Sequence, residues 1–577
     1  MKHKTPEYPT WEIRDFRDLL DGMEQRYADN IAYLWRDPLA EDGIAARTYA
    51  DMARDVKSLA AYLCAMGLEH KKIAVCGKNS YRWSISFLAI VCGCGVAVPL
   101  DREWSAAALT KFLTDAECDA ILYEDDMRDK LSAVTLDGLL KMPLSLADTY
   151  LSQGDALREA GSRSYENHTV DADALGVLVY TAGCPVIAGC PGISRGVMLS
   201  QHNLCADIMA VCSRFRIRED DRMLSHLPPH QVYQITTSMS ALYCGASVAF
   251  NDSVRRMPSD LSLFRPTVMV TVPAVVEFLS RFIEKGYAEA RGGKLLLGVQ
   301  KTATGIVSNT LGIVSKRTAE KSRRSIYSTV HSFLGGRLRA VIVGAAPLKE
   351  SVFRQLEKYG YAVYSGYGLT EASPIALMHH DKYRAPDDVG YPIPGLEVRI
   401  DDPDDNGIGA LCIKGPTVML GYYQNEEATA AVLHDGWLST GDFAQMTESC
   451  AIRITGTEKP VIVLPTGKKI VPAELESYVS AHPLVSACKV YAEGEGGELT
   501  LCVSVYPDFA QLAAALSLQT ETPDSDALKT LSEEDTARAK TLLLDIVRDV
   551  NAQLPQYKHI KKLVVRKTPF SEQAETA

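Results

Sequence analysis

The chain has 577 residues, too many for a single hydrophobic core, so we expect two to four domains. Its composition, with 46% hydrophobic and 23% charged residues, is ordinary for a soluble globular protein. The formal net charge of −11 argues against general nucleic-acid binding and is typical of an enzyme that acts on small molecules.

The fourteen cysteines are scattered, without a CxxC pair or a metal-binding spacing. This pattern favours reduced, buried thiols, and Cys92 and Cys94 lie in an apolar run that we expect in the core. The first residues are polar and do not read as a signal peptide. No apolar run is long enough to span a bilayer. We therefore expect a cytoplasmic protein without a transmembrane segment.

Helix and strand patterns alternate through residues 10–150. Expected helices cover 11–27, 48–67, 81–94 and 106–115, and expected strands cover 72–76, 95–100 and 120–123. Further along, we expect strands at 264–273 and 340–343 and a long helical insert at 280–335. The βαβ rhythm predicts an α/β fold with doubly wound parallel sheets, and residues from about 390 form a β-rich region.

Residues 180–203, YTAGCPVIAGCPGISRGVMLSQHN, form the most informative stretch. A β-favouring run enters a loop rich in glycine and proline, and a helix is expected to start at 200–203. Such a loop lets backbone N–H groups face a phosphate. It is not a Walker P-loop, because no Gly-Lys-Ser/Thr follows the glycines. Residues 182–187 look like a tandem copy of 188–193.

Residues 188–197 overlay, without a gap, the pattern S-G-T-T-G-x-P-K-G-V of the adenylate-forming superfamily. The chain resembles this superfamily, and in particular its long-chain acyl-CoA synthetases, over nearly its whole length. The strongest match is SGYGLTE at 365–371, and the segments LPPHQVY at 227–233, STGD at 439–442 and KKIVPAELE at 468–476 also resemble family segments. The resemblance implies a ligase that converts a carboxylic acid, ATP and CoA to acyl-CoA, AMP and pyrophosphate through an acyl adenylate.

The resemblance also implies the site residues. Glu371 would hold Mg²⁺, Thr370 and Arg195 would contact the phosphates, Asp442 would hold both ribose hydroxyls and Tyr367 would lie against adenine. A hard cation prefers carboxylate oxygen, and two hydroxyl donors need an acceptor. The expected nucleotide-binding residues are Thr181, Gly183, Gly189, Gly192, Gly344, Ala345, Ala346, Tyr367, Gly368 and Asp442. The expected acyl-pocket residues are His230 and Gly366.

The domain organisation follows from the same resemblance. It implies a large AMP-binding domain at 1–455, with a β-rich subdomain at about 390–455, and a small, mobile α+β domain at 456–577. A hinge is expected near Gly456. The basic residues of the helical insert could touch an anionic membrane surface or a CoA phosphate, although a solvated helix face is the commoner explanation.

The phosphate loop departs from the family pattern. The hydroxyl side chains of the pattern are replaced by Ala188, Cys190 and Pro191, and its lysine by Arg195. Alanine and proline side chains donate no hydrogen bond, and cysteine is a weak donor. The guanidinium keeps the charge but changes its geometry. Thr181 could supply one hydroxyl.

Three further departures lie near the hinge and at the C-terminus. The family's G-R-x-K-D has Thr457 for the arginine and Pro460 at the hinge, and Ala577 stands where the family has its final lysine. Arg453 is about 13 Å back along the same strand, too far to substitute. Losing one positioned cation commonly costs roughly 10²–10³ in rate.

Three interpretations stay open from the sequence. The first is an acyl-CoA synthetase with impaired adenylation. The second is a catalytically degenerate AMP- or acyl-AMP-binding protein that acts as a sensor or partner subunit. The third is an enzyme that retains only the thioester half-reaction. The sequence identifies neither the acid, with a weak preference for long chains, nor the oligomeric state.

Overall fold

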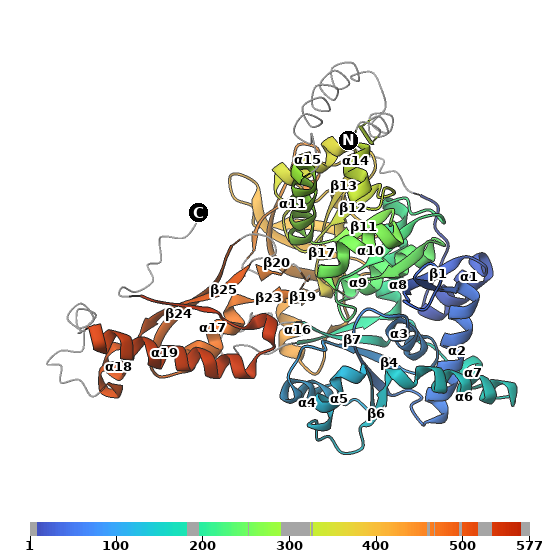
Figure 1. The fold of residues 1–577 in the computed structure, drawn as a ribbon, viewed down its shortest axis with the longest axis horizontal. Helices are drawn as coiled ribbons and strands as arrows, with labels where there is room; N and C mark the ends of the chain where they lie inside the picture. The colour runs from blue at the N-terminus through green and yellow to red at the C-terminus, as the bar shows by residue number, and fades with distance from the viewer. Residues whose placement is uncertain are drawn as a thin grey trace.

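The computed structural model describes residues 8–181, 195–251, 253–289, 323–324, 327–457, 462–464, 466, 468–494, 499–516 and 533–566. Its architecture is α/β, with two large sheets, a smaller β-sheet and a C-terminal α+β unit (Figure 1). This agrees with the fold class expected from the sequence.

The first large sheet has seven strands in the order β18-β8-β7-β4-β3-β5-β6. Strands β3 to β7 are parallel, whereas β8 is antiparallel to β7 and β18 is antiparallel to β8. The strands are β3 (Lys72–Cys76), β4 (Val96–Leu100), β5 (Ala120–Tyr123), β6 (Leu140–Pro143), β7 (Leu175–Thr181), β8 (Arg195–Ser200) and β18 (Gly421–Tyr422). The predicted strands at 72–76 and 120–123 have the bounds of β3 and β5.

The helices of this part begin where the sequence places polar caps. Ser200 caps α8 and Thr48 caps α2, each through a capping box. Cys92 and Cys94 are fully buried, as predicted. The helices are α1 (Phe16–Tyr27), α2 (Tyr49–Ala65), α3 (Tyr81–Gly93), α4 (Ala106–Asp115), α5 (Arg128–Ser132), α6 (Ala147–Glu159), α7 (Ser164–Asn167) and α8 (Gln201–Arg214).

The second large sheet has nine strands in the order β15-β14-β13-β12-β11-β9-β10-β1-β2. Strands β13 to β1 in this order are parallel, and the outer strands β2, β14 and β15 are antiparallel to their neighbours. The strands are β1 (Ile31–Arg36), β2 (Ile44–Thr48), β9 (Arg222–Ser225), β10 (Ser247–Phe250), β11 (Val268–Thr271), β12 (Ala340–Val343), β13 (Ala362–Gly368), β14 (Ile375–Met378) and β15 (Tyr391–Pro392). The helices between them are α9 (Val232–Tyr243), α10 (Met257–Phe264), α11 (Pro273–Glu289), α14 (Ser328–Phe333) and α15 (Glu350–Tyr359).

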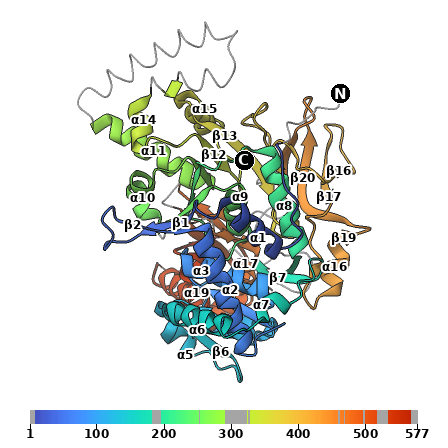
Figure 2. The same cartoon turned by 90° about the vertical axis from the view of Figure 1, so that its right-hand side faces the viewer.

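The predicted β-rich region forms a separate antiparallel sheet. Figure 2 shows it on the opposite side of the view from α10 and α14. Its elements are β16 (Glu397–Asp401), β17 (Ile408–Lys414), α16 (Glu426–Val432), β19 (Leu433–His434), β20 (Trp437–Met446) and β21 (Ile452–Thr457). Strand β21 runs to Thr457 and residues 458–461 lie outside the described residues, so the domain boundary at 456 stays a prediction.

The C-terminal unit extends to one side of the larger part (Figure 1). A three-stranded sheet, β24-β25-β26, shares a hydrophobic core with α17 and α19. The elements are β22 (Ile462–Val463), β23 (Lys469–Ile470), α17 (Pro472–Ser480), β24 (Val485–Glu493), β25 (Thr500–Pro507), α18 (Phe509–Ala515), α19 (Glu533–Gln553) and β26 (Lys562–Val565).

Two of the predicted elements begin several residues before the observed ones. The helix expected at 11–27 begins at Phe16, because the Asp15 side chain accepts a hydrogen bond from a first-turn N–H. The strand expected at 264–273 is limited to Val268–Thr271, because α10 ends before it and α11 begins directly after it.

Most of the expected helical insert, residues 290–322, lies outside the described residues. Arg323, just beyond it, donates a hydrogen bond to the Glu357 carbonyl over 3.2 Å. Within the described ranges, no helix is both long and apolar enough to cross a membrane.

Candidate active site

The ends of β12 and β13 bring two predicted segments together. The strands are parallel neighbours in which Val343 pairs with Ser365. Residues 344–346 and 366–368 therefore follow at the same edge of the sheet, the carboxyl edge, where α/β proteins bind their ligands. Gly366 pairs with Met378 of β14, which flanks this edge.

The backbone at this edge is unusual. Ala345 and Ser373 have φ values of 72° and 71°, in the left-handed region that residues other than glycine rarely adopt. Such conformations cost about 1–3 kcal/mol each and cluster at functional sites. A Cβ atom on Gly368 would lie 1.8 Å from the Pro374 carbonyl oxygen. The chain therefore requires glycine at 368.

Tyr367 and Asp442 meet although 75 residues separate them. The Tyr367 hydroxyl donates a hydrogen bond to Asp442 Oδ2 over 2.5 Å. Burial first, and then the negative charge of Asp442, raise the pKa of Tyr367 well above its usual value, so the hydroxyl keeps its proton. The structure thus places the residue predicted at adenine beside the residue predicted at ribose.

Thr457, which replaces the arginine of the family pattern, lies beside the Tyr367–Asp442 pair. Thr457 pairs with Asp442 across β20 and β21, so it brings a hydroxyl where the family pattern has a guanidinium. Arg453, earlier on β21, forms an ion pair with Asp387 and donates to its carbonyl oxygen over 3.0 Å. Arg453 is therefore directed away from the position that Thr457 occupies.

A second cluster joins β8, β18 and the turn Thr370–Ala372. The Tyr422 hydroxyl donates to Glu371 Oε1 over 3.0 Å, and the guanidinium carbon of Arg195 lies 4.9 Å from the centroid of the Tyr422 ring. All three side chains are buried. Arg195 Nη1 makes no hydrogen bond to any described residue. A buried, charged donor without a partner is expected where an anionic ligand binds.

The predicted phosphate loop lies between two described positions. Thr181 and Arg195 pair across β7 and β8 and so mark its two ends. The loop itself, with Gly183, Gly189 and Gly192, lies outside the described residues, as do Pro460 and Ala577. The roles assigned to these residues stay predictions.

A buried ion pair links the C-terminal unit to the first sheet. Asp101 directly follows β4, and Lys468 Nζ donates to its two oxygens over 2.9 and 2.8 Å. Lys468 Nζ also lies 2.8 Å from Glu103 Oε2. The side chains of Lys468 and Asp101 are 6% and 3% exposed. His230 Nε2 is 3.8 Å from Asp101 Oδ2, so the residue predicted in the acyl pocket lies at this contact.

The charges of this contact are set by burial and pairing. Burial raises the pKa of Asp101, but the charge of His230, which is protonated in the acid range where Asp101 titrates, and the charge and hydrogen bond of Lys468 outweigh burial and hold the pKa below its usual value. Burial lowers the pKa of His230, which favours a neutral imidazole at pH 7. The contact is therefore a carboxylate–ammonium pair beside a neutral ring.

Sequence reasoning missed this pair and the role of Tyr422. Lys468 lies in a segment that resembles the family, but 367 residues separate it from Asp101 and no local pattern connects them. The signal that could have found Asp101 is its position at the carboxyl end of a predicted parallel strand.

The fold and these clusters define an α/β protein with a candidate nucleotide site at a sheet edge. A family model described as AMP-binding enzyme matches residues 22–423. Because the match covers most of the sequence, the chain belongs to the AMP-binding enzyme family, within the adenylate-forming superfamily that the motifs resemble.

Individual relatives agree with this assignment. The long-chain-fatty-acid–CoA ligase FadD15 of Mycobacterium bovis is 27% identical over 554 residues, which cover 90% of each chain. Among solved structures, a double mutant of o-succinylbenzoate CoA synthetase (MenE) from Bacillus subtilis, bound with its product analogue OSB-NCoA, is similar in fold. The TM-score is 0.67 at 18% sequence identity, and the match covers 96% of this chain and 95% of that chain. ATP-bound MatB from Rhodopseudomonas palustris has a TM-score of 0.59 at 22% identity, with 97% and 96% covered. These structures share the fold of this protein.

Proposed function

We propose that the protein is an acyl-CoA synthetase-type ligase for a fatty acid, and that its ATP-dependent adenylation step is slow. The Tyr367–Asp442 hydrogen bond carries the proposal, because it forms a carboxylate acceptor for ribose beside an aromatic ring for adenine. The fatty-acid substrate is inferred from the name of the Mycobacterium bovis relative. The catalytic unit comprises a large domain at 1–455 and a small domain at 456–577.

The other predicted residues take complementary roles. Arg195 offers to a phosphate oxygen its buried Nη1, which makes no hydrogen bond within the described residues, and Thr370 adds a hydroxyl. Glu371, whose carboxylate is already oriented by Tyr422, is suited to hold Mg²⁺, which neutralises charge on phosphate oxygens when bound. The backbone of residues 344–346 borders the nucleotide. Gly366 and His230 border the acyl group.

The slow adenylation step is inferred from differences between this chain and the family pattern. The structure describes the position of one of them, Thr457, and the others are known from the sequence alone. Thr457 lies opposite Asp442, so the carboxylate that would hold ribose has no guanidinium at its paired position. A missing cation at a developing charge commonly costs roughly 10²–10³ in rate. The altered phosphate loop, Pro460 and Ala577 act in the same direction.

The same observation favours a second candidate. A protein that binds AMP or acyl-AMP without turnover, as a sensor or partner subunit, would also keep Asp442 and Tyr367 and could dispense with the arginine. The two candidates differ in the thioester half-reaction. Only a ligase would transfer the acyl group of a preformed adenylate to CoA.

Two assays on the full chain separate them. One measures palmitoyl-CoA formed from palmitoyl-AMP and CoA, and the other measures it from palmitate, ATP and CoA, with protein-free reactions as the control for spontaneous acylation. We expect the first rate to exceed the second by about 100-fold or more. No protein-dependent thioester in either assay would refute the ligase. Equal rates would refute slow adenylation.

A further inference from the structure

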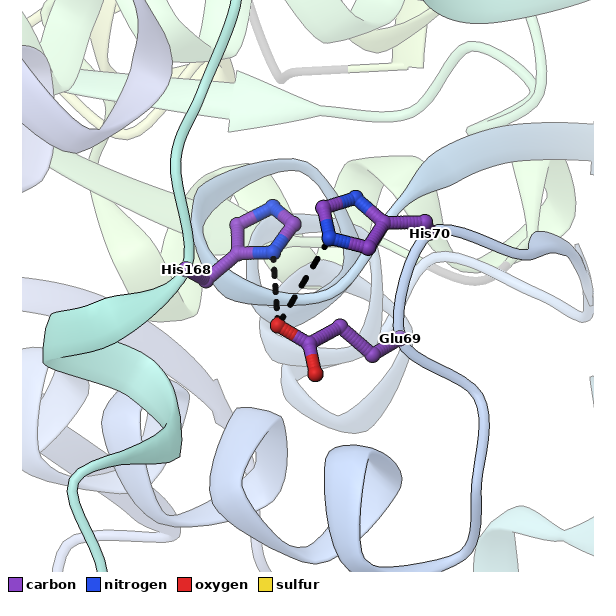
Figure 3. Close-up of side chains that lie close together, drawn as sticks. All are labelled: Glu69, His70 and His168. Carbon is purple, nitrogen blue, oxygen red and sulfur yellow. Dashed lines mark ion pairs between the residues drawn. The ribbon is translucent and has the colours of Figure 1, made fainter.

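Glu69, His70 and His168 bring three metal-ligand atoms together (Figure 3). Glu69 Oε1 lies 3.5 Å from His168 Nδ1 and 3.7 Å from His70 Nε2, and the three ligand atoms all lie within 4.8 Å of one another. Ligand atoms in a tetrahedral zinc site are about 3.3 Å apart. Small side-chain rotations would therefore bring the three atoms onto one ion.

His168 has a nitrogen without a hydrogen bond. Its side chain is 6% exposed, and its Nδ1 faces the Glu69 carboxylate but makes no hydrogen bond to any described residue (Figure 3). A neutral imidazole carries a lone pair on one ring nitrogen, and Nδ1 of His168 is the nitrogen that faces the Glu69 carboxylate. An unsatisfied buried polar atom destabilises the fold, and a ligand at Nδ1 would offset that cost.

Backbone contacts hold both histidines in place. His70 has a φ of 59°, in the left-handed region, and its N–H donates to the Cys94 carbonyl over 2.6 Å. Arg17 donates to the His168 carbonyl over 2.8 Å and also to the Tyr165 carbonyl over 2.8 Å. The positive charge of Arg17 disfavours a second cation nearby, but the Glu69 carboxylate opposes it.

The position of the cluster separates it from the candidate active site. Glu69 and His70 lie between α2 and β3, and His168 lies between α7 and β7. All three therefore precede parallel strands of the seven-stranded sheet, at its amino edge. Asp101 and Thr181 stand at the carboxyl ends of β4 and β7, which form the opposite edge. A metal at the amino edge would link the α2–β3 and α7–β7 connections, which are about 100 residues apart in sequence. It would not contact a nucleotide bound at the opposite edge.

We propose that Glu69, His70 and His168 form a transition-metal site that binds Zn²⁺ and ties the α2–β3 connection to the α7–β7 connection. Two imidazoles and one carboxylate are ligands that Zn²⁺ accepts, and water completes four-coordination. The ion stabilises this side of the sheet and takes no part in acyl transfer.

The test is calorimetric titration of Zn²⁺ into the full chain after chelator treatment. We expect one Zn²⁺ per chain whose affinity falls by about 100-fold or more in His70→Asn and in Glu69→Gln, since changes outside the ligands themselves already cost 10–100-fold. Asparagine tolerates the left-handed backbone at 70, and the His70 side chain is 68% exposed, so the fold is expected to survive. His202→Asn is the matched control, because among the described residues His202 pairs with a single carboxylate, Asp173 at 3.8 Å.

A second readout is the melting temperature. Zn²⁺ should raise the Tm of the wild type and of His202→Asn, but not that of His70→Asn, because only a protein that binds in its folded state is stabilised. No binding by the wild type would overturn the proposal. Unchanged binding by both His70→Asn and Glu69→Gln would also overturn it, since the ligands would then be other groups, such as the cysteine thiols.

Discussion

Asp442→Asn should weaken AMP binding by about 100-fold or more. The carboxylate can accept hydrogen bonds from two ribose hydroxyls, and each hydrogen bond to a charged group contributes about 1.5–3 kcal/mol. Two such bonds correspond to at least two powers of ten in Kd. Asparagine keeps the shape of the side chain, but its NH₂ group is a donor and cannot accept a hydrogen bond from a ribose hydroxyl. Calorimetric titration of AMP into the full chain measures the difference.

The matched control is Asp401→Asn, on β16 of the same small sheet. Asp401 pairs with Arg399 at a partly exposed position, outside the candidate site. We expect its AMP affinity to equal that of the wild type. An Asp442→Asn variant that binds AMP within about threefold of the wild type would contradict the ribose role of Asp442.

Lys468→Met should destabilise the protein by about 3–5 kcal/mol at pH 7, because the change leaves the buried Asp101 carboxylate without its main counter-charge. Methionine retains most of the side-chain volume, so lost packing contributes little. Urea unfolding, followed by circular dichroism, measures the difference in the free energy of unfolding. Because Lys468 belongs to the C-terminal unit and Asp101 to the first sheet, the variant should also loosen the contact between them.

Lys562→Met is the control for this prediction. Lys562 pairs with Glu493 on the same C-terminal unit, but the two side chains are 51% and 43% exposed, so solvent screens the pair and it contributes little to stability. The pH dependence gives a further check. The pKa of Asp101 is lower in the folded than in the unfolded chain, so its stabilisation is present above the unfolded pKa of about 3.9 and is lost as the pH falls through the folded value. Equal stabilities of Lys468→Met and Lys562→Met at pH 7 would contradict the buried pair.

Local patterns predicted the elements of the fold well. Strands β3 and β5 and helix α4 have the predicted bounds, because short apolar runs and a polar cap determine them. The α8 start at Ser200 was predictable from its capping residues. The length of β11 was overestimated, because the apolar run that starts at Val268 continues into α11 and because Phe264 belongs to the end of α10.

Only those residues of the candidate site that lie inside matching motifs could be predicted from the sequence. Tyr367 and Asp442 were each predicted from a matching segment, and the structure adds that they bond to each other. The Lys468–Asp101 pair and the Arg195–Tyr422–Glu371 cluster could not be predicted, because their members come from elements distant in sequence. The same holds for His70 and His168, which no spacing rule connects.

The central claim is that the nucleotide site is retained while adenylation is slow. Fatty-acid-dependent exchange of pyrophosphate into ATP tests it most directly, with wild type, Thr457→Arg and the uncharged control Thr457→Gln. We predict exchange near background for the wild type and for Thr457→Gln, and an increase of at least about tenfold for Thr457→Arg, because a guanidinium would again face the phosphate beside Asp442. Robust exchange by the wild type would contradict the claim.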